Sequence, residues 1–172
     1  RPVTAQFKWL RAIRKGLWRI RSARLPCIPL AGAYTGAVQP PVQIQIVSDF
    51  VCPWCYIAKR RLEAALARRP AIDARLSWLP FQLSPDMPRE GKDRHAHYAE
   101  IFGPERARVI MDKMVATAAA DGLLFVTGPG ARSPNTLAAH RLLYWAGQLP
   151  AIDQNALAER LSAAHHTLSE DI

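Results

Sequence analysis

The chain has 172 residues and 49% of them are apolar, so it is long enough to bury an ordinary hydrophobic core within one domain. No apolar run approaches the roughly 18 residues that cross a bilayer, so we expect no membrane-spanning helix. Three cysteines are too few for a small scaffold held by disulfides. Any redox or metal chemistry of cysteine must therefore rest on Cys27, Cys52 and Cys55.

The net charge of +9 is concentrated at one end of the chain. Residues 1–40 contain eight Lys or Arg and no acidic residue, which leaves 15 basic and 14 acidic side chains in the rest of the sequence. The basic character therefore belongs to a terminal segment and not to the body. We expect no nucleic-acid partner for the body, and membrane contact only through the basic segment.

Residues 1–41 are predicted to be a basic N-terminal extension without fixed structure. Apolar residues recur at helical spacing in the first 25 residues, so a transit-type or membrane-surface segment and a nucleic-acid arm stay open beside this interpretation. Pro and Gly gather in residues 26–41, which is the composition of a linker, and the isolated Cys27 lies there. Arg residues interrupt every candidate for the apolar core of a secretory signal, so we expect a cytoplasmic protein.

The body opens with a predicted strand, helix and strand. Apolar and polar residues alternate over 42–47 and again over 72–78. Between them the period becomes helical from Pro53, with an inner face predicted to comprise Cys55, Ala58, Leu62 and Leu66. A strand that returns after a helix pairs in parallel with the first strand, so we expect a parallel pair.

The remainder of the sequence is predicted to be mostly helical. A loop over 83–93 precedes a short helix over 93–101 and a longer one that begins with Pro104 and ends before Gly122. Ser133 is the expected N-cap of the next helix, which would end at Gly147. The expected N-cap of the last helix is Asp153, with an inner face predicted to comprise Leu157, Leu161, Ala164 and Leu168.

A Cys-Pro-Trp-Cys motif occupies the junction between the first strand and its helix. If Cys52 is the N-cap and Pro53 the first helical residue, the free N–H groups of Trp54 and Cys55 point at the Cys52 sulfur. These donors and the helix dipole favour a thiolate, so the pKa of Cys52 should fall below its usual value of about 8.5. Cys52 is thus the predicted nucleophile, and Cys55, one turn further on, the predicted resolving thiol.

The two residues between the cysteines are expected to tune this chemistry. Pro53 stiffens the turn, and Trp54 offers an apolar contact surface but no positive charge near the sulfur. We therefore expect a pKa less depressed than in a motif with His at that place, and a reduction potential below that of the strongest oxidants.

Three separate segments resemble one family. These are Ile44–Leu66 (IQIVSDFVCPWCYIAKRRLEAAL), Pro80–Pro88 (PFQLSPDMP) and Asn135–Ala146 (NTLAAHRLLYWA), and in this order they are similar to the FrnE-type branch of the DsbA-like thioredoxin-domain family. The resemblance covers residues 42–172. It implies an α/β protein of thioredoxin-like fold with an all-helical insertion at about 93–168, and thiol-disulfide oxidoreductase activity on a protein or small-molecule thiol or disulfide. It also implies a redox-active disulfide, without a prosthetic group.

The sequence departs from that family at its end. The family places further strands after the insertion, with a cis-proline loop packed on the C-x-x-C motif, and the sequence stops at Ile172 before such a segment. We therefore expect the C-terminal strands of the sheet to be missing from this chain, as in a fragment. The first strand would then have an unpaired edge.

Three alternatives to a dithiol enzyme stay open. The C-x-x-C pair is also half of a zinc site, which His140, His165 or His166 would have to complete, although we expect no metal. The related kappa-class glutathione transferase and hydroxychromene-carboxylate isomerase branch would use glutathione as co-substrate, but it is similar with Ser in place of the first Cys. An inactive binding module is the third alternative.

A few further polar residues are candidates for the site. Asp49, three residues before Cys52, is a candidate proton relay, against the ordinary role of an Asp that caps a strand end. Asn135 and His140 are candidates for the wall of a substrate groove, against a structural role for both. Lys59 is expected at the surface.

Overall fold

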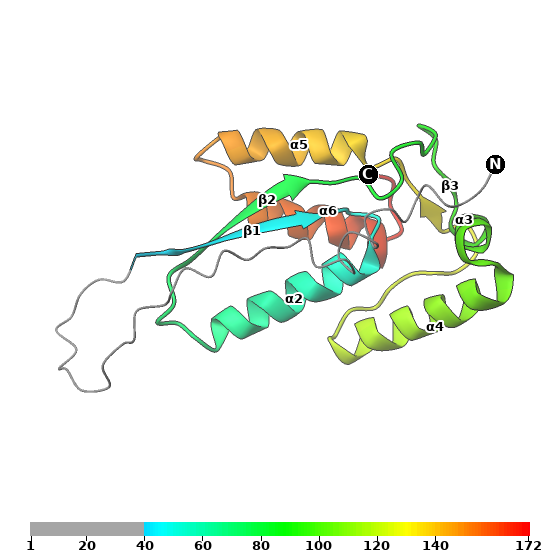
Figure 1. Cartoon of the computed structure of the whole chain (residues 1–172), viewed down its shortest axis with the longest axis horizontal. Helices are drawn as coiled ribbons and strands as arrows, with labels where there is room; N and C mark the ends of the chain where they lie inside the picture. Colours follow the sequence, from blue (N-terminus) through cyan, green and yellow to red (C-terminus); the bar gives the residue numbers. More distant parts are fainter. Residues whose placement is uncertain (1–39) are drawn as a thin grey trace, which may run out of the picture. The chain divides into compact units, whose positions relative to one another are not determined.

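Two parallel strands and the helix between them begin the fold in the computed structural model, which describes residues 40–172 (Figure 1). Strand β1 (Val42–Ser48) leads into helix α2 (Pro53–Ala67), and strand β2 (Ala74–Pro80) returns parallel to β1. The predicted strand-helix-strand unit is confirmed. Much of the predicted extension 1–41 lies outside the described residues.

The register of this sheet places its largest aromatic residue in the core. Ile46 lies opposite Trp78, and Trp78 is buried in a cluster completed by Phe50, Ala139, Leu143 and Ala158. The next pair in register, Val47 and Leu79, is exposed. Ile72, predicted to begin the second strand, is exposed and precedes β2, because the turn after α2 occupies residues 70–72.

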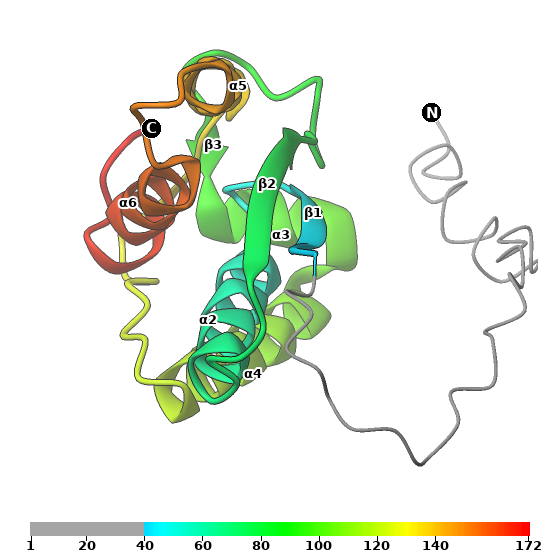
Figure 2. The same cartoon turned by 90° about the vertical axis from the view of Figure 1, so that its left-hand side faces the viewer.

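The remaining regular structure of the described chain is helical, apart from an antiparallel pair of two-residue strands. Helices α5 and α6 pack on β2, while α3 packs on α4 (Figures 1 and 2). The elements are β3 (Lys92–Asp93), α3 (Arg94–Phe102), α4 (Pro104–Ala120), β4 (Arg132–Ser133), α5 (Leu137–Gln148) and α6 (Gln154–Thr167). None of the helices in residues 40–172 is both long and apolar enough to cross a membrane.

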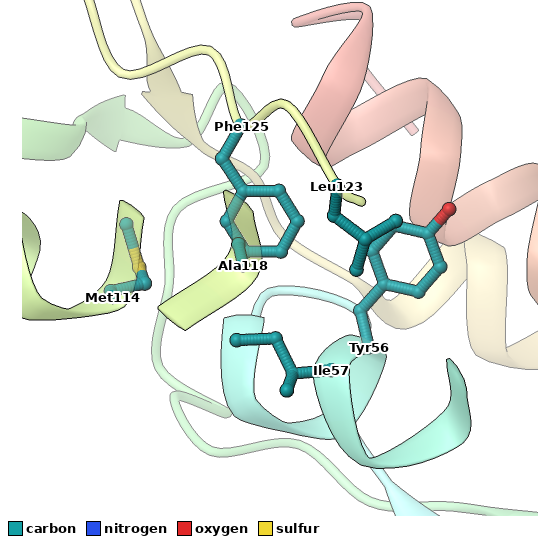
Figure 3. Close-up of a cluster of buried hydrophobic side chains, with 6 residues drawn as sticks. All are labelled: Tyr56, Ile57, Met114, Ala118, Leu123 and Phe125. Carbon is teal, nitrogen blue, oxygen red and sulfur yellow. The ribbon is translucent and has the colours of Figure 1, made fainter. Parts of the chain in front are cut away.

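A second buried cluster joins α2 to α4 and to the segment after α4 (Figure 3). It consists of Tyr56, Ile57, Met114, Ala118, Leu123 and Phe125. Burial of a side chain such as Met, Ile, Leu or Phe contributes roughly 1.5–3 kcal/mol, so these contacts are sufficient to dock α4 on α2. The buried stripe of α2 therefore runs through Tyr56 and Ile57. Ala58, predicted on the inner face, is exposed, and Leu62 and Leu66 are half-buried.

The surface position expected for Lys59 is wrong. Lys59 is 3% exposed, and its ammonium group pairs with Glu63 at 2.5 Å and with Glu159 of α6 at 2.7 Å. A buried charge is tolerated only when it is paired, and Glu159 supplies the partner from a helix 100 residues away. This ion pair fastens α6 to α2.

The predicted starts of α4 and α6 are confirmed, and that of α5 is wrong. Pro104 begins α4, and Asp153 caps α6 by accepting hydrogen bonds from the N–H groups of Asn155 and Ala156 at 2.9 and 3.0 Å. Helix α5 begins at Leu137 and not after Ser133, because Ser133 pairs with Lys92 in the β3–β4 ladder.

The inner face of α6 also differs at its end. Leu168 is 62% exposed, contrary to the prediction, whereas His165 and His166 are buried. The helix ends at Thr167, so Leu168 no longer follows the helical spacing that would turn it inward.

Candidate active site

The two thiols lie where β1 turns into α2. A tight turn joins the two elements, closed by a hydrogen bond from the N–H of Cys52 to the carbonyl oxygen of Asp49 at 3.1 Å. Cys52 has the extended backbone of an N-cap, and Pro53 is the first residue of the helix. Cys55 follows one turn later. The expected location of the motif, at the end of a strand and the start of a helix, is confirmed.

Both thiols are half-buried, and neither forms a disulfide. A hydrogen bond between the two side chains lowers the pKa of Cys55 to about 7, and the same bond, together with burial, raises the pKa of Cys52. When two thiols are joined by a hydrogen bond, the pair loses its first proton easily and its second proton with difficulty. In this reduced state the pair therefore holds one thiolate near neutral pH.

The prediction of a lowered pKa for Cys52 does not hold for this reduced pair. The backbone N–H groups of Cys55 and Trp54 do lower the pKa of Cys52, as the N-cap argument requires, but the bond to the Cys55 sulfur and burial act more strongly in the other direction. The Cys52 side chain accepts no well-formed capping hydrogen bond. The sequence argument considered the helix terminus and left out the neighbouring sulfur.

The two residues between the cysteines differ in exposure. Pro53 is buried at the start of α2, whereas Trp54 is 40% exposed beside the thiols. An exposed indole next to a half-buried sulfur is an apolar surface that a substrate can contact.

Asp49 and His140 form a buried pair behind the dithiol. Asp49 is 2% exposed and His140 is 3% exposed, with Asp49 Oδ1 at 3.1 Å from His140 Nε2. The other carboxylate oxygen of Asp49 accepts a hydrogen bond from the N–H of Leu83 at 2.7 Å. The ring of Phe50 packs against His140, with centroids 5.0 Å apart. Residues from the β1–α2 turn, the loop after β2 and helix α5 thus meet at one carboxylate.

The surroundings of His140 do not fit the predicted groove, whereas for the half-buried Asn135 the groove stays a prediction. His140 is buried against Asp49, so it does not line an open groove. Asn135 donates to the carbonyl oxygen of Met87 at 2.6 Å and accepts from the N–H of Leu137 at 3.0 Å. Its side chain therefore fastens the loop before α5 to the loop after β2.

Helix α3 contributes a residue near the thiols that the sequence did not single out. Burial and the neighbouring Cys52 raise the pKa of Tyr98 to about 12. Tyr98 therefore keeps its proton at neutral pH. No local motif indicates this approach, because α3 comes to Cys52 only through the packing of the helical part.

The histidines considered for zinc have other surroundings. His165 Nε2 lies 3.1 Å from the buried guanidinium of Arg94, and burial followed by this charge lowers the pKa of His165 to about 3. His166 stacks on Phe125, with centroids 4.8 Å apart. Among residues 40–172, no three side chains of His, Cys, Asp or Glu are grouped so as to hold a metal ion.

A dithiol at the start of a helix that follows a strand, with a helical part beside it, defines the thioredoxin-like class of redox domains. Residues 43–171 match the DSBA-like thioredoxin domain family, and the chain belongs to this family. The expected fold class, an α/β DsbA-like thioredoxin fold with helices and a small sheet, is thereby confirmed.

Known proteins are similar over parts of the chain. The crystal structure of a probable DsbA oxidoreductase from Streptomyces coelicolor superposes with a TM-score of 0.64 and 29% sequence identity, over 73% of this chain and 54% of that one. The chain thus spans about half the length of that protein. YwbO of Bacillus subtilis is 39% identical over 44 residues, which are 26% of this chain and 20% of YwbO.

Proposed function

We propose that the protein is a thiol-disulfide oxidoreductase of the FrnE-type branch, which cycles Cys52 and Cys55 between dithiol and disulfide. The observation that carries this proposal is the placement of two half-buried thiols one turn apart at the N-terminus of α2, where the hydrogen bond between them lowers the pKa of Cys55 to about 7. Only a thiolate attacks a disulfide, so a pair that holds one thiolate at neutral pH is prepared for exchange.

The reaction proceeds in two exchanges. In the oxidising direction for the enzyme, the Cys52 thiolate attacks a substrate disulfide, a Cys52–substrate bond forms, and one substrate thiolate leaves with the electron pair. The Cys55 thiolate then attacks the Cys52 sulfur and expels the second substrate thiolate. The enzyme dithiol is oxidised to a disulfide and the substrate disulfide is reduced to two thiols. The reverse sequence oxidises a substrate dithiol.

We assign the first attack to Cys52 because of its place on the helix. A thiolate on Cys52 is stabilised by the backbone N–H groups of Cys55 and Trp54, both of which act to lower the pKa of this thiol. Cys55 lies one turn inside α2. When Cys52 is joined to a substrate, Cys55 is the adjacent sulfur that releases it.

The substrate is a protein or small-molecule disulfide or thiol that docks beside Trp54. The 40% exposure of this side chain, next to the thiols, supports the placement. Glutathione fits as a thiol co-substrate of the same exchange.

Trapping of the mixed disulfide tests these roles. All proteins carry Cys27→Ser, so that only the motif reacts. With an aromatic disulfide such as 5,5′-dithiobis(2-nitrobenzoate), Cys55→Ser should stop at a stable adduct on Cys52 after one thiolate is released, whereas Cys52→Ser should react far more slowly. Mass spectrometry identifies the adduct. Stable trapping on Cys55 in Cys52→Ser at the wild-type rate would reverse the roles, and no adduct in either variant would contradict the proposal.

A further inference from the structure

Helix α5 has apolar side chains on both of its faces. The inner face turns toward β2 and α6 and buries Ala139, His140, Leu143 and Ala146. A surface helix usually presents polar residues on its other side. The outer face of α5 instead holds large apolar side chains that are 49–63% exposed, and these are Leu137, Leu142, Tyr144, Trp145 and, directly after the helix, Leu149. In Figures 1 and 2, no helix or strand of residues 40–172 lies beyond this outer face.

The composition of the outer face is that of the centre of a protein–protein interface. Such centres are enriched in Trp, Tyr and Arg and poor in Lys, Glu and Asp. Arg141 is the only residue of α5 that is a Lys, Arg, Asp or Glu, and the rings of Tyr144 and Trp145 meet edge to face with centroids 5.9 Å apart. A membrane surface or a nucleic acid would require several basic residues on this face. The outer face therefore fits a protein partner.

The residues of the outer face are arranged symmetrically about the middle of α5. Leu137 and Leu149 lie six residues to either side of position 143, and Arg141 and Trp145 lie two residues to either side. If two copies of α5 pack antiparallel about this position, Leu137 comes level with the partner's Leu149. Arg141 likewise comes level with the partner's Trp145, whose indole attracts a guanidinium group. The face is thus complementary to itself.

The antiparallel direction follows from the single charge. In a parallel pair, Arg141 would lie level with the partner's Arg141, and two like charges in contact repel each other. In the antiparallel pair the two guanidinium groups are displaced from each other along the helix, and each lies near an aromatic ring. A pair of this kind has a two-fold axis, so the same surface is used by both copies and the assembly closes at two.

The outer face is also large enough for a stable pair. Aromatic side chains present about 150–250 Å² each and large aliphatic ones somewhat less, so five of them at about half exposure present roughly 500 Å². Ala138, Arg141 and Gln148 are exposed on the same face and extend it. Each partner of a stable dimer buries roughly 600–1,000 Å². The outer face with these three residues reaches that range.

We propose that the outer face of α5 binds the outer face of α5 of a second copy of this chain, in an antiparallel two-fold dimer. The thiols stay accessible in this dimer. His140, on the inner face of α5, contacts Asp49 in the turn before Cys52, so the outer face lies on the side of the helix that points away from that turn. This pairing goes beyond the proposed dithiol function and does not depend on it.

The molar mass in solution tests the pairing. The Cys27→Ser protein is kept reduced and measured by analytical ultracentrifugation from about 1 to 100 µM, where the mass should rise to twice 19.2 kDa and no further. Trp145→Arg places a second positive charge level with the partner's Arg141 and should raise the dissociation constant at least about thirtyfold. A monomer at 100 µM in the parent protein, or a mass that keeps rising beyond two copies, overturns the proposal.

The control is Val109→Arg, the same kind of change at a side chain of α4 that is 57% exposed. This variant should remain dimeric. A dimer that persists unchanged in Trp145→Arg, or that is lost equally in Val109→Arg, contradicts the use of the outer face. Should Trp145→Arg fail to fold, as judged by circular dichroism, Leu149→Arg decides in its place, since Leu149 lies outside the helix and is 50% exposed.

Cross-linking tests the direction of the pair. In a protein with Cys27→Ser, Cys52→Ser and Cys55→Ser, a single new cysteine is introduced as Leu137→Cys or as Leu149→Cys, and a short bismaleimide is added. A mixture of the two proteins should form a covalent dimer, whereas each protein alone should form little. Efficient cross-linking of each protein alone and none between the two would show a parallel pair and overturn the proposed arrangement.

Discussion

The motif turn and the polar interior behind it are built in different ways. The turn needs only neighbours: the N–H of Cys52 bonds to Asp49, Pro53 begins the helix, and Cys55 follows one turn later. The interior instead joins residues far apart, since Asp49 and His140 are 91 residues from each other and Lys59 and Glu159 are 100. Chemistry that rests on local geometry can be recognised in a sequence, whereas its tuning rests on packing.

Leu143→Ala should give the largest loss of stability, because it removes support from the interior and leaves the turn in place. Leu143 is 1% exposed in the cluster with Phe50 and Trp78. We expect a loss of about 3–4 kcal/mol in the free energy of unfolding, measured by urea denaturation. Leu142→Ala, next to it but 52% exposed, should cost less than about 1 kcal/mol. Equal losses would show that α5 is not packed as described.

Lys59→Ala should follow, with a loss of about 2–3 kcal/mol in the same measurement. The substitution removes a buried ammonium group and leaves Glu63 and Glu159 without it. The matched control is Lys92→Ala, whose ion pair with Glu100 is exposed and contributes roughly 0–1 kcal/mol. A loss no larger than that of the control would place Lys59 at the surface, where the sequence had it.

Asp153→Ala tests a local signal and should cost about 1 kcal/mol. The side chain accepts two hydrogen bonds from N–H groups at the start of α6, and the variant leaves both donors without it. Asp112→Ala, at an exposed site within α4, should lie within about 0.5 kcal/mol of the parent protein. A neutral Asp153→Ala would mean that packing on β2 alone fixes the start of α6.

A thiolate titration should show a small change in absorbance that is specific to the two sulfurs. In the reduced Cys27→Ser protein, the absorbance near 240 nm should rise by one thiolate with a midpoint near pH 7, because the pKa of Cys55 is lowered to about 7 and that of Cys52 is raised. Cys52→Ala should move the midpoint of Cys55 upward, since the hydrogen bond from the Cys52 thiol is lost. Two thiolates below pH 8 would show that the sulfurs do not share a proton.

The difference between local and long-range contacts explains which elements could be predicted from the sequence. The parallel pair of strands, the helix that starts at Pro53 and the cap at Asp153 follow from alternation, spacing and turn residues, and each is confirmed. The start of α5 was wrong because Pro134 is typical of a first helical residue, but Ser133 is held in a strand pair with Lys92. A contact 41 residues away in the sequence outweighed the local preference.

The same difference between local and long-range contacts applies to the residues of the site. The positions of Cys52 and Cys55 followed from the motif, while the distribution of the proton between them depends on the distance and burial of the two sulfurs, which composition does not encode. Asp49 was a candidate from its place beside the motif. Its partner His140 was assigned to a groove, because nothing local to α5 shows that this side chain points at the end of β1.

The central claim is that Cys52 and Cys55 form a reversible redox pair, and a titration against glutathione tests it most directly. The Cys27→Ser protein is equilibrated over a series of reduced to oxidised glutathione ratios, and the fraction of disulfide is read by mass after alkylation. We predict one reversible two-electron transition, which disappears in Cys55→Ser. Absence of a transition, or one that persists in Cys55→Ser, would contradict the account.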